Sequence, residues 1–124
     1  MLIESVVRVA RNPDVELFVA RTAGPPGRRV LLVIHGGPDW DHTYLREPLV
    51  GLSGSSRVVF RDLRGCGRST RGLADGDYTP DAVVADLLAL LDAMGVERAD
   101  VLGFSYGGLL AQRLALAAPA RVRR

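Results

Sequence analysis

The chain has one cysteine, Cys66, and no lysine, so all sixteen basic residues are arginine. A lone cysteine excludes an intramolecular disulfide, which favours a reducing compartment. The apolar runs are short, and none approaches the roughly 20 residues that a membrane-spanning helix needs. Glu4 and Arg8 interrupt the apolar N-terminal stretch, which therefore lacks the pattern of a signal peptide. We expect a cytoplasmic protein that does not bind a membrane.

Charge is balanced, and no sign dominates. The formal net charge is only +2 and the arginines are scattered along the sequence, so the charge pattern does not predict a nucleic-acid partner. The one dense basic stretch, residues 121–124, is interpreted as a solvated approach to a strand and not as a polyanion site. No ligand spacing typical of a metal site occurs, and no glycine pattern indicates a nucleotide. The sequence predicts neither a cofactor nor a metal.

The 124 residues, 48% hydrophobic and 24% charged, have the composition of an ordinary globular protein. Neither an internal repeat nor a long linker divides them, so residues 1–124 are predicted to form one domain. Two β-rich runs, 3–10 and 15–21, flank the turn sequence RNPD and indicate an antiparallel hairpin.

Three apolar strands alternate with three helices after this hairpin. The strands are expected at 30–34, 57–62 and 98–104, and the helices at 42–52, 80–94 and 106–118. Thr79 is a suitable N-cap, Pro80 fits the first helical position and Gly95 ends the second helix, whereas Pro48 is expected to interrupt the first. The alternation predicts an α/β fold with five strands in a mostly parallel sheet and helices on both faces. Ligands of such sheets bind outside the C-terminal ends of the strands.

The clearest motif is GFSYGG, which joins the last strand to the last helix. Its first five residues fit the pattern G-x-S-x-G between a strand and a helix, which is the context of a nucleophile elbow. The turn leaves no room for side chains beside the serine, so Gly103 and Gly107 remove Cβ atoms that would collide, and Gly108 eases packing of the helix. Ser105 is then predicted to occupy a strained backbone conformation with an exposed hydroxyl. The alternative interpretation is a glycine-rich turn with an incidental serine.

A second motif, HGGPDW, follows the strand at 30–34. Gly36 and Gly37 let the backbone pass close to a reacting centre, and Pro38 has no N–H, so Gly37 is the candidate donor. With the amide of Tyr106 it is predicted to form a two-donor oxyanion hole.

The chain has only two histidines, and both lie near this motif. His35 precedes the glycines at the end of a strand, so we interpret it as a structural residue that bonds the loop and not as a general base. His42 stands at the expected start of a helix, where we interpret it as a cap or a surface residue.

A third motif, RDLRGCGRST, leaves the strand at 57–62. Asp62, Arg64 and Ser69 are its polar residues, and bidentate pairing of arginine with a carboxylate is expected to make the loop rigid beside the site. We interpret these residues as scaffolding, and Cys66 as an inert thiol.

Together, HGGPDW, DLRGCGRS and GFSYGG resemble the α/β-hydrolase superfamily, most closely its proline iminopeptidase (serine aminopeptidase) branch and the related esterases. The resemblance implies that Ser105 is the nucleophile and that the amides of Gly37 and Tyr106 form the oxyanion hole. Dehalogenases and epoxide hydrolases have an aspartate at the elbow, so serine implies cleavage of ester or amide bonds in a small-molecule or peptide substrate. Asp39 stands where the family usually has glycine, and we hypothesise that its charge attracts a substrate amine.

The superfamily places its triad acid and histidine after the serine, and no Asp, Glu or His follows Ser105 in this sequence. The resemblance therefore covers about the first half of a complete enzyme, and the chain alone is expected to be nearly inactive because no base activates the serine. The strand at 98–104 is expected to be an unpaired edge of the sheet.

Three explanations remain open for this arrangement. The chain is one half of a two-chain hydrolase completed by a C-terminal segment, an incomplete gene product, or a module that associates with itself through the exposed edge. The alternative to a hydrolase is a non-catalytic homologue that acts as a binding or assembly module. The substrate is not specified, because the lid that shapes specificity in this superfamily is usually inserted after a later strand.

Overall fold

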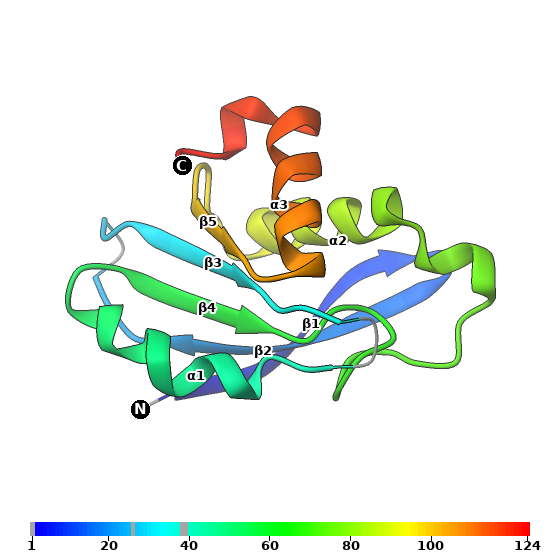
Figure 1. Ribbon diagram of the computed structural model, residues 1–124, viewed down its shortest axis with the longest axis horizontal. Helices are drawn as coiled ribbons and strands as arrows, with labels where there is room; N and C mark the ends of the chain where they lie inside the picture. Colours follow the sequence, from blue (N-terminus) through cyan, green and yellow to red (C-terminus); the bar gives the residue numbers. More distant parts are fainter. Residues whose placement is uncertain (1, 26, 38–39) are drawn as a thin grey trace.

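A five-stranded sheet forms the centre of the computed structural model, which describes residues 2–25, 27–37 and 40–124. The strands are β1 (Leu2–Arg11), β2 (Asp14–Thr22), β3 (Val30–Ile34), β4 (Arg57–Arg61) and β5 (Asp100–Gly103). They lie in the order β1-β2-β4-β3-β5 (Figure 1). β3 pairs in parallel with β4 and β5, and β2 is antiparallel to β1 and β4, so four of these strands share one direction. The predicted α/β fold, with a mostly parallel sheet that begins with an antiparallel hairpin, is confirmed.

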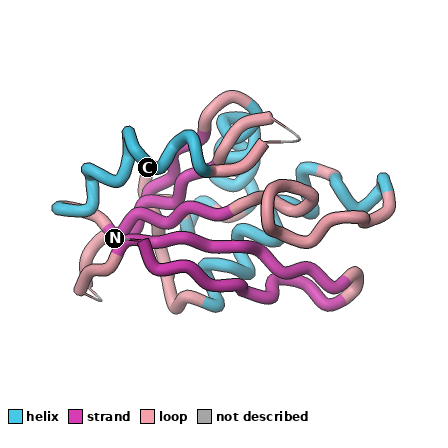
Figure 2. Tube along the Cα trace, turned by 90° about the horizontal axis from the view of Figure 1, so that it is seen from below, coloured by secondary structure: helices cyan, strands magenta, loops and turns pink. Residues whose placement is uncertain are grey.

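Helices cover both faces of the sheet. They are α1 (Thr43–Val50), α2 (Pro80–Ala93) and α3 (Tyr106–Ala117), with short 3₁₀ turns η1 (Gly51–Gly54), η2 (Asp75–Tyr78) and η3 (Pro119–Arg121). α2 and α3 lie together on one face and enclose the larger apolar core, whereas α1 covers a smaller core on the other face (Figure 1). The β1–β2 hairpin is the longest pair of strands and reaches past the others (Figure 2). No helix in the described part of the chain combines the length and the apolar character needed to cross a bilayer.

The start of α2 follows the sequence prediction closely. Thr79 is the N-cap, and its hydroxyl accepts a hydrogen bond from the Ala82 N–H at 3.2 Å. Pro80 is the first helical residue, where its missing N–H costs nothing. Gly95, just after the helix, has a φ of +68°, a conformation that favours glycine.

Pro48 does not interrupt α1 as expected. It lies inside the helix, which continues to Val50 and then tightens into η1. Pro48 is the sixth residue of an eight-residue helix, so it removes one backbone hydrogen bond close to the end, where few remain to be lost.

The outer edge of β5 is partly covered by the last residues of the chain. Val122 forms a parallel bridge with Ala99. The N–H groups of Ala99 and Val101 donate to the carbonyls of Arg121 and Arg124 at 2.9 and 2.8 Å. The expectation of an unpaired edge along this whole strand is therefore wrong, because residues 121–124 approach it as a short strand-like segment.

Candidate functional site

Ser105 occupies the turn between β5 and α3 and is exposed to solvent. Its backbone angles are φ 58° and ψ −119°, and it is the only residue other than glycine with a positive φ in the described ranges. Such a conformation costs of order 1–3 kcal/mol and persists only where surrounding structure imposes it. The turn thus holds the serine outward in a conformation that costs free energy. A serine that was incidental to a glycine-rich turn would not need to occupy such a conformation.

The glycines on either side of Ser105 explain how the turn closes. A Cβ at Gly103 would overlap the carbonyl of Gly107, and a Cβ at Gly107 would overlap the carbonyl of Ile34. Gly108 differs, because a Cβ there would lie 3.7 Å from the Gly103 oxygen, an ordinary contact. Close approach therefore requires glycine at 103 and 107 but not at 108.

The loop after β3 runs directly against the elbow. A Cβ at Gly36 would lie 2.9 Å from the Ser105 Cβ and 2.8 Å from the Phe104 oxygen. The Gly36 N–H donates to the Tyr44 hydroxyl at 2.8 Å. Gly37 has a φ of +68°, with the Trp40 ring packed against its α-carbon. Two further residues of the sequence hypothesis, Pro38 and Asp39, lie outside the described residues.

His35 is fully buried, and both of its ring nitrogens are engaged. Nε2 accepts the Leu63 N–H at 3.0 Å, so the proton belongs on Nδ1, which donates to the Gly36 carbonyl at 2.9 Å. Burial lowers the pKa of His35 below its ordinary value of 6.5 and keeps the ring neutral. The ring ties the loop after β3 to the loop after β4.

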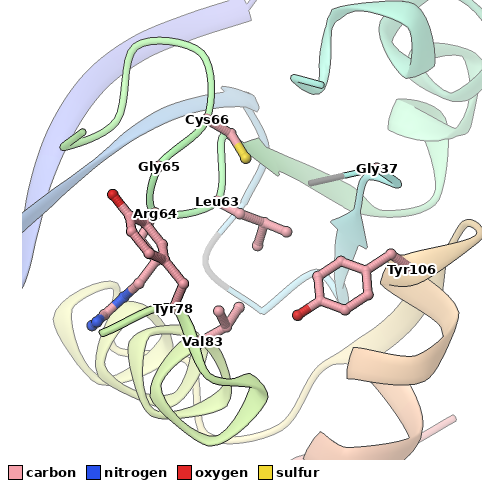
Figure 3. A pocket seen from close by; sticks show the side chains of 8 residues that line it. All are labelled: Gly37, Leu63, Arg64, Gly65, Cys66, Tyr78, Val83 and Tyr106. Carbon is pink, nitrogen blue, oxygen red and sulfur yellow. The ribbon is translucent and has the colours of Figure 1, made fainter. Parts of the chain in front are cut away.

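Gly37 and Tyr106 line one cavity of about 380 Å³ at the C-terminal ends of the strands. Figure 3 shows the Tyr106 ring pointing into it from the start of α3, with Leu63, Cys66 and Val83 around it. Tyr106 is the first residue of α3, and the first N–H groups of a helix have no acceptor within it. The two predicted donor residues thus line one cavity, and Ser105 directly precedes Tyr106 in the chain.

The Asp62 carboxylate contacts the ring of His42 and not the side chain of an arginine. The His42 Nδ1 lies 2.6 Å from the Asp62 carboxylate, and the N–H groups of His42 and Arg68 also donate to it. Burial opposes ionisation of Asp62, but these hydrogen bonds outweigh burial and hold its pKa below its usual range. His42 is 1% exposed, so the prediction of a surface residue is wrong; it occupies the N-cap position of α1 without a capping side-chain bond.

Arg64 forms the bidentate pair that the third motif predicted, but with a partner that sequence reasoning missed. Its Nε and Nη2 each lie 2.6 Å from the Asp86 carboxylate in the middle of α2, and its Nη1 donates to the Asp77 carbonyl. The Asp86 hydrogen bonds raise the pKa of Arg64. The only sequence signal was Asp86 itself, a charged residue on the apolar face of a helix.

Neither histidine is placed to take a proton from Ser105. Both nitrogens of His35 are bonded to backbone groups, and the Nε2 of His42 accepts from the Arg46 Nε at 2.8 Å while its Nδ1 faces Asp62. Within the described ranges, no three potential metal ligands are grouped as a metal ion would need. The turn therefore presents a serine hydroxyl beside a cavity lined by Gly37 and Tyr106, and neither imidazole of this chain is free to act as a base for it.

A model of the family described as alpha/beta hydrolase fold matches residues 29–124. The chain belongs to the α/β-hydrolase family. The proline iminopeptidase of Saccharolobus solfataricus is 42% identical over 90 residues, covering 71% of this chain and 29% of that protein. Epoxide hydrolase 4 of Mus musculus is 30% identical over 102 residues, covering 82% of this chain and 28% of that protein.

Solved structures of α/β-hydrolases agree with this membership. A proline iminopeptidase-related protein from Thermus thermophilus superimposes with a TM-score of 0.87 at 35% identity. The alignment covers 97% of this chain and 42% of that one. This α/β-hydrolase chain thus spans less than half the length of these relatives, and the resemblance to the proline iminopeptidase branch is confirmed for the part it covers.

Proposed function

We propose that this chain supplies the nucleophile and oxyanion hole of a serine hydrolase that cleaves ester or amide bonds. The observation that carries the proposal is that Ser105 is exposed, has a strained backbone and directly precedes Tyr106, which lines the cavity together with Gly37. The Ser105 Oγ attacks the substrate carbonyl, and the N–H groups of Gly37 and Tyr106 stabilise the negative charge that forms on its oxygen. The leaving group departs, and water releases the acyl group from the serine.

The acid and the base come from outside residues 1–124 in this proposal. Both histidines are already bonded, and no acidic residue follows the serine in this sequence. Serine hydroxyls are poor nucleophiles at neutral pH without a base. A complementary C-terminal segment is therefore the partner that we propose for catalysis, and the substrate is a small acyl compound or a peptide.

A chimera tests the proposal. Residues 1–124 replace the matching part of the Saccharolobus solfataricus proline iminopeptidase, and hydrolysis of p-nitrophenyl acetate and proline p-nitroanilide is measured. We expect the chimera to hydrolyse at least one of them and the isolated chain to be far slower. Ser105→Ala in the chimera should lower turnover by about 10³-fold or more.

A folded chimera that keeps its activity after Ser105→Ala would exclude Ser105 as the nucleophile. A chimera that has native circular dichroism but neither turns over substrate nor reacts with a fluorophosphonate would favour the non-catalytic binding or assembly module. Size-exclusion chromatography of the isolated chain separately tests association through the edge of β5.

A further inference from the structure

Arginines that are far apart in the sequence lie together at the N-terminal ends of the parallel strands, opposite the end that carries Ser105. A hollow of about 300 Å³ opens there, where β3, β4 and β5 begin. Five arginines from four segments line it: Arg28, Arg29, Arg57, Arg98 and Arg123. The arginines that look scattered along the sequence are therefore partly clustered in space.

The acidic residues around this hollow do not balance its charge. Glu97 and Asp100 also line it, which leaves five positive groups against two negative ones. Among the described residues, no carboxylate lies within ion-pair distance of Arg29 or Arg98. Like charges gathered in one hollow repel each other, and a bound anion would relieve that repulsion.

Backbone contacts hold part of the hollow in place before any ligand binds. Arg28 donates from Nη1 to the Ser53 carbonyl at 3.0 Å. The Arg57 N–H donates to the Arg29 carbonyl at 2.7 Å, which ties the loop before β3 to the start of β4. The first contact holds the guanidinium of Arg28 and the second holds the backbone beside Arg29 and Arg57. Guanidinium groups match the oxygens of a phosphate group.

Asp100 adds a second requirement for the ligand. Its Oδ1 is buried and has no hydrogen-bond partner among the described residues. A buried acceptor of this kind calls for a donor, since leaving it unsatisfied costs about 1–3 kcal/mol. Asp100 lines the hollow, so a turn of its carboxylate toward the hollow would let a hydroxyl group of the ligand supply that donor.

We propose that this hollow, the arginine pocket, binds a small phosphate ester whose carrier bears hydroxyl groups. The phosphate oxygens accept hydrogen bonds from the arginines, and a hydroxyl of the carrier donates to Asp100. The site lies at the starts of the strands, so it is separate from the cavity beside Ser105, and it does not depend on the proposed hydrolase activity.

Calorimetric titration of the 124-residue chain tests the pocket, with glycerol 3-phosphate, methyl phosphate and glycerol as probes. We expect saturable binding of both phosphates, tighter for glycerol 3-phosphate, and none of glycerol. The double variant Arg29→Gln/Arg98→Gln should weaken phosphate binding about tenfold or more. Both side chains are exposed, so the fold should persist, which circular dichroism checks.

Arg71→Gln is the matched control, because it removes one positive charge from an exposed residue outside the pocket. Equal weakening in this control, or no saturable binding by the unmodified chain, would overturn the proposal. Asp100→Val should bring the affinities for glycerol 3-phosphate and methyl phosphate to the same value. An affinity ratio that Asp100→Val leaves unchanged would refute the role of the carrier hydroxyl.

Two further probes identify the source of the phosphate. Phosphatidylglycerol vesicles present the same glycerol phosphate on a membrane, and a single-stranded oligonucleotide presents phosphodiesters. Binding of either probe through Arg29 and Arg98, without binding of the free ester, would replace the proposed ligand and overturn the proposal in this form.

Discussion

A hydrogen bond from His35 holds the peptide group whose N–H, that of Gly37, is the predicted oxyanion donor. The His35 Nδ1–H bonds the Gly36 carbonyl, and that carbonyl belongs to the same planar peptide as the Gly37 N–H. Its Nε2 can accept the Leu63 N–H only while the ring is neutral. One buried imidazole thus links its own protonation state to the orientation of the loop.

The first prediction is that stability decreases as the pH falls below the ordinary histidine pKa of 6.5. Below that pH the unfolded chain binds a proton at His35 while the folded chain does not, so protonation favours unfolding. The loss continues down to the lowered pKa of the folded state, with a slope of at most about 1.4 kcal/mol per pH unit. Urea unfolding at pH 7, 6 and 5 measures it.

His35→Gln is the comparison for this pH series. The variant is expected to be less stable throughout but to lose less stability between pH 7 and pH 5 than the unmodified chain. Identical pH slopes for the two proteins would mean that His35 does not titrate differently in the folded and unfolded states.

At the scale of the element, the elbow depends on backbone that passes close to backbone. β5 and α3 meet so tightly that Gly107 faces the Ile34 carbonyl of β3, whereas its neighbour Gly108 has room for a methyl group. The two glycines are adjacent in the same helix, so they share helix propensity and differ only in their surroundings.

The second prediction separates these two glycines. Gly107→Ala should lower the free energy of unfolding by about 1–3 kcal/mol or more, because the new Cβ forces the helix away from β3. Gly108→Ala should be neutral or stabilising by up to about 1 kcal/mol, since alanine is the better helix former. Thermal and urea unfolding of both variants checks this, and equal destabilisation would contradict the packing that the structure describes.

Local signals in the sequence were sufficient for most elements and for the elbow. Thr79, Pro80 and Gly95 define α2 through contacts a few residues apart, and the glycines beside Ser105 mark a turn that admits little else. The hydrogen-bond partners of polar residues could not be predicted from local signals, because they depend on how distant segments pack. The buried His42–Asp62 contact joins residues 20 apart and could not be inferred from either motif alone.

At the scale of the whole molecule, the two ends of the parallel strands carry different groups of functional side chains. Ser105 and the cavity lined by Gly37 and Tyr106 lie at the C-terminal ends of the strands, and the arginine pocket lies at their starts. This separation arises because β4, β3 and β5 are parallel, so all three strands begin at one end of the sheet and finish at the other. The motifs in the sequence predicted the site at the C-terminal ends of the strands. They did not predict the arginine pocket, because its arginines come from four separate segments.

The third prediction concerns the ion pair that joins the loop after β4 to α2. Arg64 and Asp86 are 7% and 2% exposed, so Asp86→Asn leaves a buried guanidinium without its counter-charge. We expect a loss of about 3–5 kcal/mol in the free energy of unfolding, measured in urea. The double variant Arg64→Met/Asp86→Leu should recover much of that loss, because it removes both buried charges together.

Asp81→Asn is the control for this pair, since it breaks the exposed contact between Arg113 and Asp81 on the neighbouring helices. Exposed ion pairs contribute little in water, so this variant should unfold at the same urea concentration as the unmodified chain. If Asp86→Asn is tolerated as well as Asp81→Asn, the loop after β4 does not depend on α2. The cavity wall that Arg64 shares with Gly65, Tyr78 and Val83 would then need another explanation for its shape.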